Sequence, residues 1–183
     1  MKRAILTAMT VLVAWAAPAA PAAGPQLTVL LAGGSEENTI NIWLTPDGRS
    51  YVIDSVVPLE VGGSVCSHPE GQPNELICSA ASIGGFEVNA GASDDAVVVA
   101  GAVRIPTTLR GGQGDDDLIG GSGADKLIGG PGDDTLVGRA ATDSLYGGPG
   151  ADRLVGGGGY DLLHGDSGED ALFGGPGGNE LVP

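Results

Sequence analysis

A leucine recurs at every ninth residue from Leu118 to Leu181. It marks eight units of nine residues that run from Gly111 to Val182 without insertions. The first six positions of each unit are rich in Gly and Asp, and the leucine stands at position eight. A disordered Gly/Asp-rich linker has no reason to place an apolar side chain at a fixed interval. The period therefore predicts a repeating structure that turns one leucine per unit inward.

Each unit divides into a turn and a short strand. The leucine and its two neighbours suit a strand, because side chains alternate between the two faces and the leucine can point inward. The six Gly-rich residues suit a tight turn, since glycine tolerates positive φ. Two units then form one 18-residue coil, and eight units form four coils whose parallel strands stack about 4.8 Å apart. The fold class predicted for residues 111–182 is all-β, a parallel β-roll with a thin leucine core.

The consensus of the units is G-G-x-G-x-D-x-U-x, where U is a large apolar residue. Position six is Asp in seven units and Asn in the eighth. This pattern resembles the hemolysin-type calcium-binding repeat (RTX nonapeptide repeat) family of secreted bacterial proteins, and it covers 72 of the 183 residues. The resemblance implies a right-handed parallel β-roll, a solenoid that calcium stabilises.

The stacking of coils places candidate metal sites between the turns of units i and i+2, which lie on the same edge of the roll. Carboxylate and carbonyl oxygens are hard ligands that suit Ca²⁺. We call the edge formed by the first, third, fifth and seventh turns the odd edge, and the other the even edge. The candidate ligands of the odd edge are Asp116, Asp134, Asp152 and Asp170, with the turn glycines Gly112, Gly114, Gly130, Gly132, Gly148, Gly150 and Gly168. Those of the even edge are Asp125, Asp143, Asp161 and Asn179.

The two edges are not equivalent in sequence. Arg139 and Ala141 replace glycines of the fourth unit, and Arg139 brings a positive charge into that turn. The last even-edge turn carries Asn179 in place of Asp. The sequence therefore predicts three ions on the odd edge and fewer on the even edge, with little contribution from Asp143.

Acidic residues dominate the chain, with 23 Asp and Glu against 8 Lys and Arg, a net charge of −15. This balance argues against nucleic-acid binding and against attachment to anionic lipid, which both need basic residues. Residues 111–182 alone hold 13 acidic and 3 basic side chains, a net charge of −10 (3 − 13). With one buried leucine per nine residues, we expect this segment to fold fully only when calcium offsets the repulsion.

The N-terminal residues are typical of a signal peptide. Lys2 and Arg3 precede an uncharged, mostly apolar run over 4–17, and small residues follow over 18–23. The run is shorter than the roughly 20 residues that a membrane-spanning helix needs. We therefore expect residues 1–23 to be a signal peptide, no membrane anchor, and a secreted mature chain.

Residues 24–110 form a second, β-rich segment. Strands are predicted over 27–31, 39–44, 51–57, 75–79, 83–88 and 96–100, with a hairpin turn over 45–49. Two stretches, 33–40 and 90–97, weakly echo the nonapeptide. The segment either caps the N-terminal end of the roll, since solenoids need caps, or forms a separate small β domain.

The two cysteines of the chain fall in this segment. Cys66 and Cys78 enclose 11 residues, and in an oxidising compartment they predict one disulfide. A zinc site is the alternative, but it would need more ligands, and only His68 is nearby.

The sequence shows no catalytic residue set. There are only two histidines, and neither a G-x-S-x-G nor an H-E-x-x-H motif is present. The predicted function is a secreted, non-enzymatic calcium-binding protein that folds on binding. One alternative is an extracellular adhesion or scaffold protein with a cell-surface or glycan partner, and another is a hydrolase with a calcium-stabilised tail.

Overall fold

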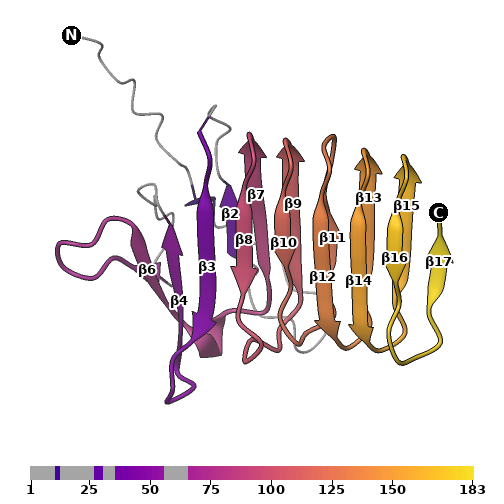
Figure 1. The fold of residues 1–183 in the computed structure, drawn as a ribbon. Coiled ribbons are helices and arrows are strands. Elements are labelled where there is room, and N and C mark those ends of the chain that lie inside the picture. Colours follow the sequence, from indigo (N-terminus) through magenta and orange to yellow (C-terminus); the bar gives the residue numbers. More distant parts are fainter. Residues whose placement is uncertain (1–10, 13–26, 31–35, 56–65) are drawn as a thin grey trace, which may run out of the picture.

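The computed structural model describes residues 11–12, 27–30, 36–55 and 66–183. The expected signal peptide therefore lies outside the described residues, apart from Val11–Leu12. The described residues form two sheets, which we call sheet A and sheet B, with strands stacked side by side along the molecule (Figure 1). None of the helices found in these residues is long and apolar enough to cross a membrane.

From β7 onward, the chain alternates between the two sheets. In spatial order, sheet A contains β1 (Val11–Leu12), β2 (Leu27–Leu30), β7 (Phe86–Ala92), β9 (Thr107–Gln113), β11 (Lys126–Ile128), β13 (Ser144–Pro149), β15 (Leu162–Ser167) and β17 (Glu180–Val182). Sheet B contains β16 (Ala171–Phe173), β14 (Arg153–Gly158), β12 (Thr135–Ala140), β10 (Asp117–Ile119), β8 (Ala96–Val99), β3 (Thr39–Leu44), β4 (Ser50–Ser55), β6 (Glu75–Ser79) and β5 (Cys66–Ser67). A short 3₁₀ turn, η1 (Ala80–Ser82), follows β6.

The register of the parallel strands confirms the predicted β-roll. Leu118 pairs with Leu136 in sheet B, and Leu127 pairs with Leu145 in sheet A. Each pairing is offset by 18 residues, which is two units per coil. The leucines of the first six units are fully buried between the sheets, whereas Leu181 at the C-terminal end is 47% exposed. The leucine period thus dictates both the register and the core.

Several strands are longer than the three residues predicted. Strands β12 to β15 each span six residues, because turn positions also pair between coils. Arg139 pairs with Gly157, for example, and Gly148 with Asp166. The stacked turns are therefore in register as strictly as the strands.

The first half of the chain continues the same two sheets. Strands β2 and β7 extend sheet A in parallel, and β3 and β8 extend sheet B in parallel. Strands β4, β6 and β5 then add to sheet B in antiparallel order. One continuous cluster of buried side chains runs from Ile40 to Leu163. The strand expected over 83–88 begins later, at Phe86, because Gly84 and Gly85 lie in the loop before it.

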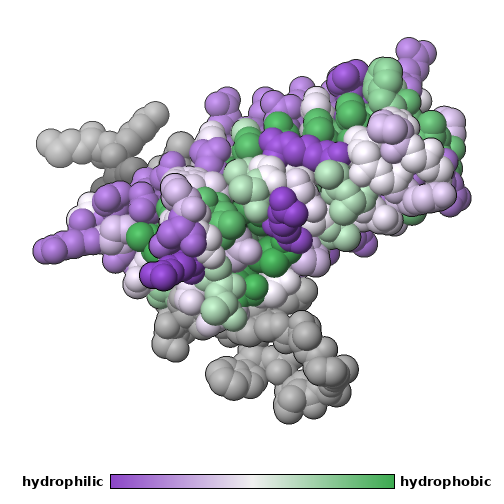
Figure 2. Space-filling model, turned by 90° about the horizontal axis from the view of Figure 1, so that it is seen from below, coloured by the Kyte–Doolittle hydropathy of each residue, from purple (hydrophilic) through white to green (hydrophobic). Residues whose placement is uncertain are grey.

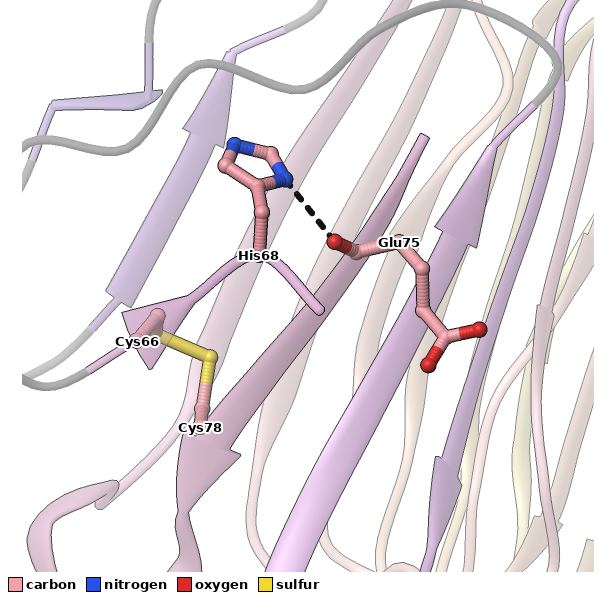
Figure 3. The surroundings of a disulfide bond; sticks show 4 residues. All are labelled: Cys66, His68, Glu75 and Cys78. Atoms are coloured by element: carbon pink, nitrogen blue, oxygen red, sulfur yellow. Dashed lines mark hydrogen bonds between the residues drawn. A yellow bond between two sulfur atoms is a disulfide. The ribbon is translucent and has the colours of Figure 1, made fainter. Parts of the chain in front are cut away.

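A disulfide closes the antiparallel end of sheet B. Cys66 in β5 pairs with Cys78 in β6, and their sulfur atoms are bonded (Figure 3). The Nδ1 of His68 lies 2.9 Å from the Glu75 carbonyl oxygen. A carbonyl can only accept, so Nδ1 donates. With both cysteines in the disulfide, the zinc alternative loses its thiolate ligands.

The outer face of sheet B carries a row of apolar side chains. Position nine of the odd units is Ile119, Val137, Val155 and Phe173, and each of these residues pairs with the next across the strands. The first three are half-buried and Phe173 is exposed. Figure 2 shows hydrophobic residues in a row along the roll.

Candidate calcium sites between the stacked turns

The Asp side chains at position six point into the roll. Asp116, Asp134 and Asp152 on the odd edge are each about 1% exposed. The first glycine of each turn makes room for this carboxylate: a methyl group on Gly111 would lie 2.1 Å from Asp116 Oδ2, and one on Gly129 would lie 2.1 Å from Asp134 Oδ2. The glycine at position one is therefore needed because a buried carboxylate lies against it.

One oxygen of each carboxylate joins neighbouring coils. The backbone N–H of Asp116 donates to Asp134 Oδ1 at 2.8 Å, and that of Asp134 donates to Asp152 Oδ1 at 2.8 Å. The even edge repeats this arrangement, with the N–H of Asp125 donating to Asp143 Oδ1 at 2.8 Å. The side chains at position six thus form a ladder along each edge and are held in one orientation.

The second oxygen of these carboxylates, Oδ2, takes no part in the ladder. Six Oδ2 atoms are buried and have no hydrogen-bond partner among the described residues. They belong to Asp95, Asp116, Asp134, Asp143, Asp152 and Asp161. A buried acceptor without a donor is costly, and a buried negative charge is more so. A row of such oxygens fits a row of cations.

Burial also changes the proton affinity of these groups. It raises the pKa of Asp116, Asp134 and Asp143 to about 7, and the negative charges of neighbouring Asp side chains add to the effect. Burial likewise raises the pKa of Asp152. A carboxyl with a pKa of about 7 is protonated about half of the time at pH 7, so without a cation Asp116, Asp134 and Asp143 carry less negative charge in the folded roll than in the unfolded chain.

The turns pack so closely that the carbonyl oxygens of one turn lie against the glycines of the next. A methyl group on Gly130 would lie 2.0 Å from the Gly112 carbonyl oxygen, and one on Gly132 would lie 1.9 Å from that of Gly114. These glycines have positive φ, 124° and 148°. Within the described residues, no three or more His, Cys, Asp or Glu side chains converge as a metal-ligand group. Each pair of turns therefore offers two carboxylates, and carbonyl oxygens would have to supply the other ligands, as suits Ca²⁺.

One consensus turn on the even edge differs from the others. In turn 120–125, Gly121 and Gly123 do not have the positive φ found at positions two and four of the other turns. Asp125 Oδ2 accepts from the N–H of Gly121 at 2.7 Å, and its Oδ1 accepts from the N–H and the Oγ1 of Thr107, both at 2.8 Å. Asp125 therefore has a full set of protein donors, in contrast to the other buried carboxylates.

The turn with altered sequence has the regular conformation. Arg139 and Ala141 adopt φ of 84° and 81°, as glycines do at these positions elsewhere. The guanidinium of Arg139 turns toward the N-terminal end, where Nη1 donates to the carbonyl oxygens of Val99 and, at 2.9 Å, Gly120. Asp143, in the same turn, keeps a buried Oδ2 that has no partner in the described part of the chain. These contacts argue against the expectation that Asp143 contributes little, and they make turn 120–125 the atypical one.

At the C-terminal end of the array, both edges are more open. Asp170 accepts from the N–H of Asp152 at 3.0 Å and is half-buried. Asn179 Oδ1 accepts from the N–H of Asp161 at 2.9 Å, while its Nδ2 donates to the Gly175 carbonyl oxygen. An amide nitrogen cannot serve as a metal ligand here, so Asn179 offers one oxygen where the other turns offer two.

Sequence reasoning missed part of the odd-edge row. Asp95 belongs to the same ladder, because its N–H donates to Asp116 Oδ1 at 2.9 Å. A second, exposed ladder joins Asp94, Asp115 and Asp133 at position five, through N–H donors to each Oδ1. The only sequence signal was the weak echo of the nonapeptide over residues 90–97.

Comparison with known proteins agrees with this geometry. Residues 110–145 and 146–181 each match the family model for the RTX calcium-binding nonapeptide repeat (4 copies). No curated protein and no solved structure matches the chain at a significant level. Residues 110–181, 72 of the 183 in the chain, therefore carry the RTX calcium-binding nonapeptide repeats that this family model describes.

Proposed function

We propose that this chain is a secreted, non-enzymatic protein that binds several calcium ions between the stacked turns of its roll and folds fully only when they are bound. The observation that carries the proposal is the row of buried carboxylate oxygens without donors. The family match supplies the identity of the cation, since its repeats are calcium-binding.

The residues that would hold the ions are the position-six carboxylates of turns that follow one another on an edge. On the odd edge these include the pairs Asp116 with Asp134 and Asp134 with Asp152, which the ladder of hydrogen bonds keeps together. The calcium ion would supply the positive charge that the net −10 of residues 111–182 lacks. It would also satisfy the Oδ2 atoms for which the described residues supply no donor.

Secretion is supported by one feature of the structure. The chain carries a disulfide, which persists in oxidising compartments outside the cytosol. If the sites bind calcium as extracellular modules do, at about 10⁻⁴ to 10⁻³ M, they would fill only outside the cell. The roll would then form after export, where calcium is abundant.

A calcium titration of the purified chain tests this function. Isothermal titration should show several ions bound with Kd values of about 10⁻⁴ to 10⁻³ M, and circular dichroism should show a gain of β structure. Magnesium should bind weakly and cause little gain of β structure, because it demands a small octahedral shell and gives up its waters reluctantly. Identical spectra with and without millimolar calcium would contradict the proposal.

Two of the even-edge turns, 120–125 and 138–143, give a matched pair of variants. Asp143→Asn should lower the number of calcium ions bound, because Asp143 Oδ2 is buried without a donor and faces the same edge as Asp161. Asp125→Asn should leave the number unchanged, because protein donors already satisfy both oxygens of Asp125. Native mass spectrometry in calcium counts the ions for each variant. If Asp125→Asn loses as many ions as Asp143→Asn, the distinction between these turns is wrong.

A further inference from the structure

We propose that the odd edge carries one more calcium site than the nonapeptide repeats account for, between turn 90–95 and turn 111–116, with Asp95 and Asp116 as its carboxylate ligands. Turn 90–95 lies outside the repeats, which the family model matches only from residue 110. The inference rests on the proposed function, since it assumes that the roll binds calcium at all.

The backbone of turn 90–95 has the conformation of a repeat turn. Gly91 and Ser93 stand at positions two and four, with φ of 120° and 90°. The glycines at the same positions of the next turn, Gly112 and Gly114, have φ of 130° and 118°. Positive φ is costly for a serine, so the surrounding structure holds Ser93 in this conformation.

The two turns also stack as repeat turns do. A methyl group on Gly112 would lie 1.8 Å from the Gly91 carbonyl oxygen, as one on Gly130 would lie 2.0 Å from that of Gly112. The N–H of Ser93 donates to the Gln113 carbonyl oxygen at 2.7 Å, which matches the bond from Gly114 N–H to Pro131 at 3.0 Å. The carbonyl and amide groups around the two carboxylates are thus arranged as in the recognised repeats.

The carboxylates supply the evidence for a ligand. Asp95 is 3% exposed and Asp116 is 1% exposed, and the Oδ2 atoms of both are buried without a hydrogen-bond partner in the described part of the chain. The negative charges of Asp94 and Glu37 act on Asp95 as well. Two buried, aligned oxygens under this local negative charge are what a divalent cation would neutralise.

Turn 90–95 cannot be found from the nine-residue period, because it is out of phase with the repeats. Turns 90–95 and 111–116 are 21 residues apart, whereas the recognised turns of one edge are 18 apart. The register places the three extra residues on the opposite edge, in the crossing from β8 to β9. Ala96 pairs with Asp117, at an offset of 21, but Thr108 already pairs with Lys126, at 18. The longer crossing interrupts the nonapeptide period without disturbing the odd edge.

The row ends at Asp95. The next side chain along the odd edge is Asn38, whose N–H and Nδ2 both donate to Asp95 Oδ1, at 2.7 and 3.0 Å. Its amide nitrogen also approaches the Ala90 carbonyl oxygen at 3.3 Å. Asn38 thus presents donors where the other turns present a carboxylate, so it closes the row of sites.

Native mass spectrometry of three chains tests the proposal. Asp95→Asn keeps Oδ1 for Asn38 and removes the charge, and it should bind one calcium ion fewer than the original chain. Asp94→Asn removes the same charge from the exposed neighbouring side chain, and it should bind the original number. Circular dichroism in saturating calcium should show that both variants retain the β-roll.

The outcomes separate this site from the rest of the account. An unchanged ion count in Asp95→Asn, or an equal loss in Asp94→Asn, would overturn the additional site and leave calcium binding by the repeats intact. Loss of every ion in Asp95→Asn would overturn it as well, because Asp95 would then act through folding and not as the ligand of one site. A chain that binds no calcium in its original form would overturn the proposed function instead.

Discussion

Without calcium, the roll should be more stable at pH 5 than at pH 8. Burial raises the pKa of Asp116, Asp134 and Asp143 to about 7 in the folded chain, from the ordinary value of 3.8 for an Asp carboxyl. A carboxyl whose pKa is higher in the folded chain stabilises the fold most below the unfolded value, and this contribution is lost as the pH rises through about 7. The folded state binds more protons, so stability falls with rising pH.

The difference in folding stability between pH 5 and pH 8 should be on the order of 1 kcal/mol for each of these carboxyls, after allowance for solvent screening. Circular dichroism of chains stripped of calcium on a chelating resin measures the remaining β structure at pH 5, 6, 7 and 8. The triple variant of Asp116, Asp134 and Asp143 to Asn should flatten the dependence, because its amides do not titrate. Equal β structure at pH 5 and pH 8 in the original chain would contradict this expectation.

Calcium should reverse this trend. Protons and calcium compete for the same carboxylates, and metal ligands must be deprotonated to bind. In saturating calcium the roll should therefore be more stable at pH 8 than at pH 5. The opposite pH dependences of stability with and without calcium distinguish carboxylates that bind a cation from carboxylates that are merely buried.

The leucine period was enough to predict the fold of the repeats. It gave one inward side chain per unit, and the observed pairing of Leu118 with Leu136 follows from it directly. The period also placed Asp134 and Asp152 on one edge, where they are joined by a hydrogen bond. Strict periodicity works because each coil repeats the contacts of the one before it.

The first half of the chain was harder to predict because it builds the same sheets without the repeat. Strands β3 and β8 pair in parallel, although the hairpin strands β4 to β6 lie between them in the sequence. Their buried residues include Ile40 and Val97, and nothing in a short run of β-branched residues specifies a partner far along the chain. The pairing is decided by which apolar face continues the leucine core.

The even edge shows that the match of a single turn to the consensus does not determine its backbone conformation. Turn 120–125 matches the consensus, yet its backbone differs from that of the other turns. The reason lies in its neighbour: a methyl group on Gly121 would lie 2.6 Å from the Val103 carbonyl oxygen, within the longer crossing from β8 to β9. Arg139 departs from consensus, yet its turn follows the regular neighbours with which it pairs. The conformation of a turn depends on the coil it stacks on as well as on its own residues.

Removing one central carboxylate should cost two calcium ions. Asp134 lies between Asp116 and Asp152 on the odd edge and is hydrogen-bonded to both through the ladder. If ions sit between successive turns, Asp134 is a ligand of two of them. Asp134→Asn keeps the Oδ1 that accepts from Asp116 and removes only the charge and Oδ2, so the coils should remain in register.

Two further variants calibrate this expectation. Asp170 is the last aspartate of the odd-edge ladder and serves one pair only, with Asp152, so Asp170→Asn should cost one ion. Asp133 is exposed and accepts from the N–H of Ala151 at 2.8 Å, so Asp133→Asn should cost none, although it removes the same charge.

The number of calcium ions retained by these chains in native mass spectrometry is the most direct test of ions shared between stacked turns. We predict losses of two ions for Asp134→Asn, one for Asp170→Asn and none for Asp133→Asn. Equal losses for Asp134→Asn and Asp170→Asn would contradict it, because each ion would then belong to a single turn.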